Sequence, residues 1–228
     1  MWYRSGSPVR FESTKQRETP LTGFPVVSMH AAYVCARATS METPRSPLVL
    51  DPAVVSADVV ARHLGLEPLD QEGGWFRRTY VSDLAWPPGT LPAIYEGRRQ
   101  AASAIYALFT PDGFSAMHRL ITDEIWCFHA GDPLESLRLH PDGAFEWVRL
   151  GLAVGEGQRP QDVVMGHVWQ GTRLAAGGRW ALVSCVMAPE FAWADFELGD
   201  RAALAGRFPE AAEGIAALTR DVPPVGQR

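Results

Sequence analysis

The sequence predicts an all-β sandwich or barrel, with a short helix on its N-terminal side and helices on its C-terminal side. About nine short runs rich in aromatic and β-branched residues follow one another between residues 75 and 187, at spacings of roughly 8–12 residues. Turn-forming Gly, Pro and Asp residues separate these runs. No helix-length segment lies between them, which disfavours a parallel α/β sheet.

The strands are expected where apolar runs are bounded by turn residues. Pro141-Asp142-Gly143 stands between two short runs and is typical of a hairpin turn. The expected strands are Trp75–Val81, Ala102–Thr110, Phe114–Leu120, Glu124–His129, Leu134–Leu139, Phe145–Leu150, Asp162–Met165, Val168–Leu174 and Trp180–Met187.

Helices are expected at both ends of the strand region. Residues 51–66 have apolar residues near helical spacing, with Ser56 as a possible N-cap and Gly65 as the stop. After the last strand, Asp200 can cap a helix over Arg201–Phe208. Pro209 then opens a second helix that runs to about residue 219.

The chain divides into three parts by composition. Residues 1–47 mix Ser, Thr, Pro and Arg without a sustained period, which predicts a poorly ordered N-terminal extension. A targeting peptide is the alternative for this part, and Met29 and Met41 are both plausible true starts. Residues 48–220 form the expected domain, and residues 221–228 a C-terminal tail.

Composition limits the classes of partner. The net charge of −5 and the absence of a Lys/Arg run indicate no nucleic acid partner. No stretch reaches the length of a membrane span, and the N-terminus lacks the continuous apolar segment of a secretory signal, so a cytoplasmic location is expected. Three cysteines without CxxC spacing predict neither a disulfide framework nor a zinc knuckle. The expected partner is a small-molecule ligand.

The most informative segment is residues 113–131, which resembles the first motif of the cupins. In that motif two His separated by one residue are followed by a Glu and then a Gly. His118 takes the first His position, Glu124 the Glu position and Gly131 the final Gly, whereas Leu120 stands at the second His.

The second cupin motif falls on residues 161–170. Gln170 stands there at the usual His position, and Met165-Gly166-His167 replaces the turn that precedes it. Leu120 and Gln170 thus stand where metal-binding cupins have His ligands.

The whole region 64–220 resembles a narrower family, the DUF985 or cupin-5 proteins within the RmlC-like cupins. The resemblance implies an all-β double-stranded β-helix, that is, a jelly-roll cupin barrel, and a homodimer. The matching segments include Leu64–Pro68, Glu72–Tyr80, Phe114–Arg119, Asp123–Trp126, Gly131–Leu134, Val168–Gln170 and Asp195–Leu198.

Strand alternation places the candidate chemistry inside this barrel. With Glu124 pointing inward, Trp126 points inward too, and His118 inward leaves Arg119 outward. A His beside a carboxylate can act as a base, with Tyr106 as a possible acid on the other side of a substrate. The residues expected to bind the substrate are Glu72, Arg77, Tyr80, Trp126, Trp169 and Gln170.

Three functions remain open from the sequence. The first is a metal-independent isomerase or epimerase of a carbohydrate-like or polar metabolite, as in RmlC-like epimerases, with His118 as base, Glu124 as its orienting partner and Tyr106 as acid. The second is a non-catalytic metabolite-binding cupin. The third is a metal-dependent enzyme, for which His118, Glu124 and Gln170 are weak candidate ligands. No cofactor is expected, because only His118 and Glu124 are strong metal ligands and Gln170 is a poor third.

Overall fold

The computed structural model describes residues 48–69 and 73–220. The predicted extension over residues 1–47 and the predicted tail over residues 221–228 lie outside the described residues. Within the described part of the chain, no helix has the length and apolar character needed to cross a membrane.

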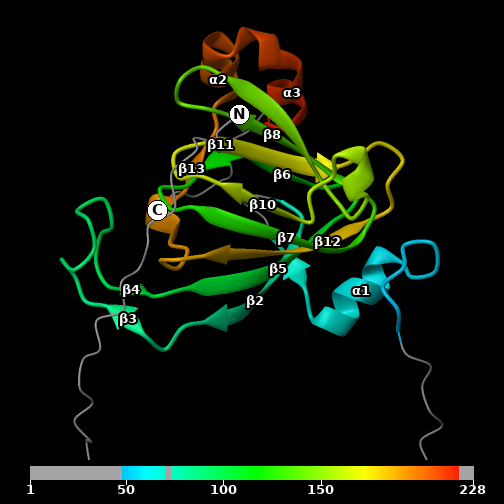
Figure 1. The fold of residues 1–228 in the computed structure, drawn as a ribbon, viewed down its shortest axis with the longest axis horizontal. Helices are drawn as coiled ribbons and strands as arrows, with labels where there is room; N and C mark the ends of the chain where they lie inside the picture. Colours follow the sequence, from blue (N-terminus) through cyan, green and yellow to red (C-terminus); the bar gives the residue numbers. More distant parts are fainter. Residues whose placement is uncertain (1–47, 70–72, 221–228) are drawn as a thin grey trace, which may run out of the picture. The chain divides into compact units, whose positions relative to one another are not determined.

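Two antiparallel sheets dominate the domain (Figure 1). The larger sheet has the strand order β1-β2-β5-β12-β7-β10, and the smaller one has the order β13-β6-β11-β8-β9. The six strands of the larger sheet are β1 Glu67–Pro68, β2 Trp75–Val81, β5 Ser103–Phe109, β7 Glu124–Gly131, β10 Gln161–Val164 and β12 Ala181–Met187. The five strands of the smaller sheet are β6 Phe114–Arg119, β8 Leu134–Leu139, β9 Phe145–Leu150, β11 Trp169–Leu174 and β13 Glu197–Leu198. A separate pair is formed by β3 Ala85–Trp86 and β4 Arg99–Gln100.

The predicted all-β class and all nine predicted strands are confirmed, with boundaries that differ by no more than two residues. The short strands β1, β3, β4 and β13 escaped prediction because two residues carry no alternation. The predicted hairpin at Pro141-Asp142-Gly143 joins β8 to β9, where Asp142 Oδ1 accepts a hydrogen bond from the Ala144 amide and Gly143 adopts a φ of 96°.

The helices lie outside the barrel. Helix α1 covers Ala57–Leu64, and the predicted stop at Gly65 is confirmed by a left-handed φ of 61°. Ser56 occupies the N-cap position, but its side chain makes no capping hydrogen bond, so this part of the prediction is wrong. Asp200 does cap α2, which covers Arg201–Arg207, by accepting a hydrogen bond from the Ala203 amide.

Beyond α2, Pro209 opens the short 3-10 turn η3 Pro209–Ala211, which leads into helix α3 Ala212–Ala217. Two further 3-10 turns are η1 Val154–Glu156 and η2 Trp193–Asp195.

Three apolar clusters hold these layers together. One fills the space between the two sheets and includes Trp126, Phe128 and Leu150. A second joins the outer face of the smaller sheet to α2 and α3, which lie above that sheet in Figure 1. A third packs α1 on the outer face of the larger sheet through Val60 and Leu182. The first cluster thus lies in the barrel interior, and the other two lie on the outer faces of the sheets.

Candidate functional site

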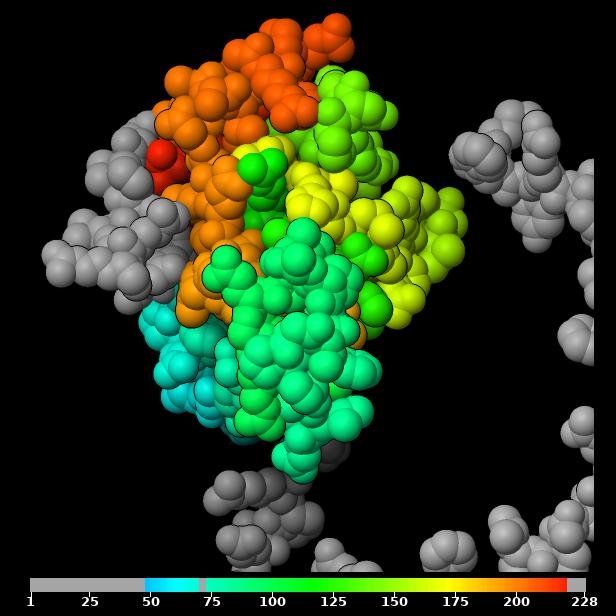
Figure 2. Space-filling model, turned by 90° about the vertical axis from the view of Figure 1, so that its left-hand side faces the viewer, coloured from blue at the N-terminus to red at the C-terminus, as the bar shows by residue number. Residues whose placement is uncertain are grey.

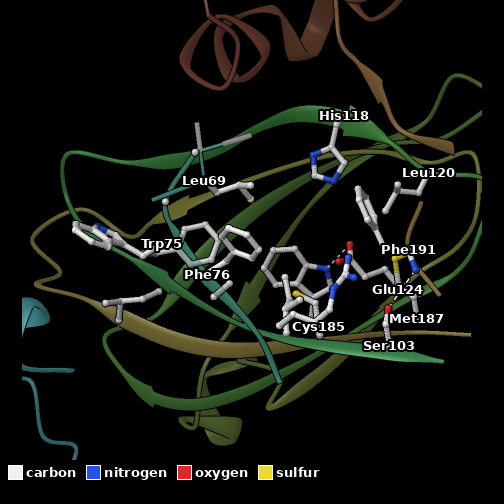
Figure 3. A pocket seen from close by; sticks show the side chains of 18 of the residues that line it. Leu69, Trp75, Phe76, Ser103, His118, Leu120, Glu124, Cys185, Met187 and Phe191 are labelled. Atoms are coloured by element: carbon white, nitrogen blue, oxygen red, sulfur yellow. Dashed lines mark hydrogen bonds between the residues drawn. The ribbon is translucent and has the colours of Figure 1, made fainter. Parts of the chain in front are cut away.

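A cavity of about 390 Å³ opens between the two sheets. Figure 3 shows His118 pointing into it from one side and Glu124 approaching from the other. His118 belongs to β6 of the smaller sheet and Glu124 to β7 of the larger sheet, so each sheet contributes one ionisable group. The volume matches the lower part of the range typical of small-molecule sites.

His118 is held in one orientation. Its side chain is 2% exposed, and its Nδ1 donates a hydrogen bond of 2.8 Å to the carbonyl oxygen of Ala116. The ring also stacks on Phe196 at 5.1 Å between centroids. Because a carbonyl only accepts, Nδ1 carries the proton in the neutral ring and the lone pair is on Nε2. The contacts with Ala116 and Phe196 therefore help to orient His118.

Glu124 is fixed through one carboxylate oxygen. Its Oε2 accepts hydrogen bonds from Trp126 Nε1 at 3.0 Å and from Gln170 Nε2 at 2.6 Å. Two donors on one oxygen fix the plane of the carboxylate within the cavity wall.

Behind Glu124 runs a buried polar chain. The Oε1 atom of Gln170 accepts a 2.9 Å hydrogen bond from Arg138, whose other nitrogen lies 3.5 Å from Asp162. Asp162 also pairs with Arg159 at 2.8 Å. Burial lowers the pKa of Arg138, while the negative charges of Asp162 and Glu124 act to raise it. The amide of Gln170 thus bridges a buried carboxylate and a buried guanidinium.

One wall of the cavity comes from the segment after β12. Phe191 and Trp193 line the cavity, and Asp195 forms a buried two-bond ion pair with Arg99, at 2.7 and 2.8 Å. Figure 2 shows this segment, in orange, beside the green segment that carries Arg99. The ion pair anchors the aromatic wall beside His118.

The predicted tyrosines do not reach this cavity. Tyr106 lies on the outer face of the larger sheet, where its ring meets His129 edge-on at 5.8 Å. Strand alternation gives the reason, since Ser103, Ile105 and other odd-numbered residues of β5 line the cavity. Tyr80 is 53% exposed and does not line the cavity either. The predicted pairing of His118 with Tyr106 across the substrate is therefore wrong.

The other predicted contacts separate into three groups. Trp126 lines the cavity, and Gln170 supports Glu124 from behind. Trp169 instead packs on the far face of the smaller sheet under α2 and α3, because it alternates with Gln170 along β11. Glu72 lies outside the described residues.

The predicted arginine is the wrong one of the pair. Arg77 sits opposite Tyr106 in the sheet register, on the outer face, while Arg78 sits opposite Ile105 and lines the cavity. Only one of the two can face inward, because neighbours in a strand alternate. The register of β2 against β5 decides which of the two arginines faces the cavity, and that register is set by the fold.

Several lining residues escaped sequence reasoning, most of them apolar. Alternation along β5 and β12 could have indicated those on the strands, whereas the loop residues gave no signal. The charged, polar and aromatic residues among those missed are Glu67, Trp75, Phe76, Arg78, Ser103, Phe109, Phe191 and Trp193.

The donor atoms of the described lining residues do not fit a tight site for a divalent metal ion. Such an ion needs at least three nitrogen, sulfur or carboxylate ligands. Leu120 lines the cavity at the position of a second His, and both ends of the Gln170 amide are already hydrogen-bonded. Within residues 48–69 and 73–220, no group of three His, Cys, Asp or Glu side chains is placed to hold a metal ion.

Two facing antiparallel sheets around a ligand-sized cavity, with a His from one sheet and a Glu from the other, define a cupin-type barrel. A family model described as Cupin superfamily (DUF985) matches residues 58–199. The chain belongs to this family.

Solved structures of similar proteins agree with this assignment. A protein of Shewanella oneidensis is 33% identical with a TM-score of 0.63, covering 73% of this chain and 98% of its own. A hypothetical protein of Leishmania major is 29% identical with a TM-score of 0.66, covering 73% of this chain and 100% of its own. A search of the curated proteins finds no match. Neither relative's description names an activity, so function has to be argued from the site.

Proposed function

We propose that this chain is a small-molecule-binding cupin whose His118 and Glu124 transfer a proton on the bound ligand, as in an isomerase. The observation that carries the proposal is that a His and a carboxylate from opposite sheets line one largely apolar cavity, and that each is held by hydrogen bonds from behind. Orientation of this kind is what general acid–base catalysis requires.

In this reaction a base takes a proton from a carbon next to a carbonyl group. The proton is returned to another face or another atom of the same molecule, so that substrate and product have the same composition. His118 Nε2 and the Glu124 carboxylate are the two proton-transfer groups. Because Tyr106 lies on the outer face, it does not act as the acid that the sequence suggested. Glu124 takes that role in place of Tyr106.

Exchange of carbon-bound hydrogen with solvent tests the proposal without a known product. The protein is incubated in D₂O with a panel of aliphatic and aryl ketones, with and without a carboxylate at the end of the molecule far from the carbonyl group, and proton NMR follows the loss of each C–H signal. We expect catalysed exchange on at least one compound, reduced at least about a hundredfold in His118→Ala and in Glu124→Gln, as typical for loss of acid–base catalysis.

Matched controls exist on the outer surface. His129→Ala removes a His of β7 that faces away from the cavity, and Glu146→Gln neutralises an exposed carboxylate of β9. Both are expected to retain exchange. Wild-type exchange rates that persist in His118→Ala with unchanged circular dichroism would remove the His from the mechanism.

A binding protein without chemistry is the second candidate. It is favoured by the mainly apolar lining and by the two donors that hold Glu124 as a fixed acceptor. Ligand-induced thermal stabilisation without hydrogen exchange on that same ligand would select it.

We also propose the homodimer that the family resemblance implies. An apolar row crosses five strands on the outer face of the larger sheet, and Ile125, Val163 and Tyr80 of that row are 36%, 48% and 53% exposed. The full row in register is Tyr80, Ala104, Val186, Ile125 and Val163. Ile125→Lys should produce monomers in sedimentation velocity, whereas Gln161→Lys, in the polar row beside it, should not; dimers in both would refute this face.

A further inference from the structure

The chemistry of the cavity lining is mainly apolar. Aromatic and aliphatic side chains make up most of the walls, among them Trp75, Phe76, Phe109, Trp126 and Phe191. Figure 3 shows Trp75 and Phe76 at one end of the cavity, away from His118 and Glu124. A sugar presents hydroxyl groups on all sides and needs a hydrogen-bond partner for each one that it buries. The walls thus fit an apolar body better than a carbohydrate.

One permanent cation lies at the edge of these walls. Arg78 occupies the inward-facing row Arg78–Ile105–Cys185–Trp126 that runs across the larger sheet. No described residue forms a hydrogen bond or ion pair with its guanidinium, and the side chain is exposed. Strand β1 pairs only with Trp75 and Phe76, so among the described strands β5 alone lies beside Arg78, and none lies on the other side of β2 there. An unpaired guanidinium at a cavity mouth can bind a carboxylate with two parallel hydrogen bonds.

The distance between Arg78 and the proton-transfer pair sets the form of the ligand. Glu124 is on β7, three strands from β2 in the order of the larger sheet. At about 4.8 Å per strand, the two backbones are roughly 14 Å apart. Both side chains extend into the same cavity, which shortens the gap between them. A ligand a few ångström shorter than the backbone separation can therefore contact both.

We propose that the ligand is a small organic monocarboxylate with an apolar, preferably aromatic, body. Its carboxylate binds Arg78, its body lies against the aromatic walls, and its other end reaches His118 and Glu124. This deepens the proposed function by naming the substrate class, and it rests on the same cavity but not on proton transfer.

The remaining charges argue for a single negative charge on the ligand. Glu67 and Glu124 are the carboxylates among the described lining residues, and Arg78 is the permanent cation there. A phosphate with two negative charges would meet more repulsion than one guanidinium offsets. Sugar phosphates and dicarboxylates are therefore poorer ligands than monocarboxylates.

Affinity for a matched pair of probes tests the proposal. The full-length protein is titrated with 5-phenylpentanoate and with its neutral amide, 5-phenylpentanamide, by isothermal titration calorimetry, with glucose 6-phosphate as a polar comparison. We expect the carboxylate to bind about tenfold more tightly than the amide, and glucose 6-phosphate more weakly than either.

The neighbouring arginines provide the control variants. Arg78→Ala should abolish the preference for the carboxylate, and Arg78→Lys should restore part of it. Arg77→Ala changes the next residue on the outer face of the same strand and should retain the full preference. Glu67→Gln should strengthen carboxylate binding severalfold, because it removes a negative charge from the lining.

Each result decides the matter. Equal affinity for the acid and the amide, a preference that persists in Arg78→Ala, tighter binding of glucose 6-phosphate, or no binding of either phenyl probe would overturn the substrate class. None of these readouts involves turnover. The His118→Ala protein should still prefer the carboxylate, so failure of the proton-transfer proposal leaves a separate signature.

Discussion

Replacement of Gln170 by Leu tests whether the buried polar chain holds the site together. The Gln170 side chain is 1% exposed, and its amide joins Glu124 to Arg138 by hydrogen bonds of 2.6 and 2.9 Å. Leu has a similar volume, so the change removes polar contacts and leaves little cavity. It leaves a buried carboxylate with one donor fewer and a buried guanidinium with one acceptor fewer.

The expected loss follows from those two contacts. A hydrogen bond to a charged group contributes about 1.5–3 kcal/mol, so two give roughly 3–6 kcal/mol. Burial of the Leu side chain offsets roughly 1–2 kcal/mol of this. We expect the free energy of unfolding to fall by about 3 kcal/mol, measured by urea denaturation with tryptophan fluorescence.

The matched control is Gln161→Leu, since Gln161 is exposed on β10, a strand of the other sheet, and should change stability by less than about 0.5 kcal/mol. A double-mutant cycle with Glu124→Gln isolates the contact between Glu124 and Gln170. A loss below about 1 kcal/mol in Gln170→Leu, or no coupling in the cycle, would refute the view that this amide bridges the two charges.

Three further predictions concern a turn, the missing metal ligands and the ion pair beside the cavity. His167 is exposed with a φ of 67°, so His167→Gly should raise the free energy of unfolding by about 0.5–1 kcal/mol in urea denaturation; a loss of stability would contradict the strain. Leu120→His combined with Gln170→His should create stoichiometric binding of Ni²⁺ or Zn²⁺ by calorimetry and mass spectrometry, beyond that of the wild type, and failure to gain affinity would refute the placement of these two positions around one centre. Asp195→Asn should lower the free energy of unfolding by about 3–5 kcal/mol because it leaves Arg99 buried without its charge partner, and a change below about 1 kcal/mol would contradict that role.

Local patterns were enough to find the strands and the central pair of the site. Period-2 alternation and turn residues are properties of neighbouring residues, so the nine long strands could be read along the chain. The spacing from His118 to Glu124 and Gly131 led to the cupin resemblance, and both ionisable groups do line the cavity. Alternation also placed Trp126 inward correctly.

Tertiary structure decided which side chains join that pair. Alternation states that Arg77 and Arg78 face opposite ways, and that Trp169 and Gln170 do, but it does not state which of each two faces inward. The pairing of β2 with β5 and of β11 with its neighbours makes that choice.

By itself, then, the sequence determined an all-β cupin barrel with His118 and Glu124 at its centre, because those features depend on residue type and local spacing. Only the fold placed Tyr106 on the outer face, brought Arg78 to the cavity and joined Glu124 to Gln170. Contacts of this kind depend on the register between strands far apart in the chain, which is set by the packing of the whole barrel.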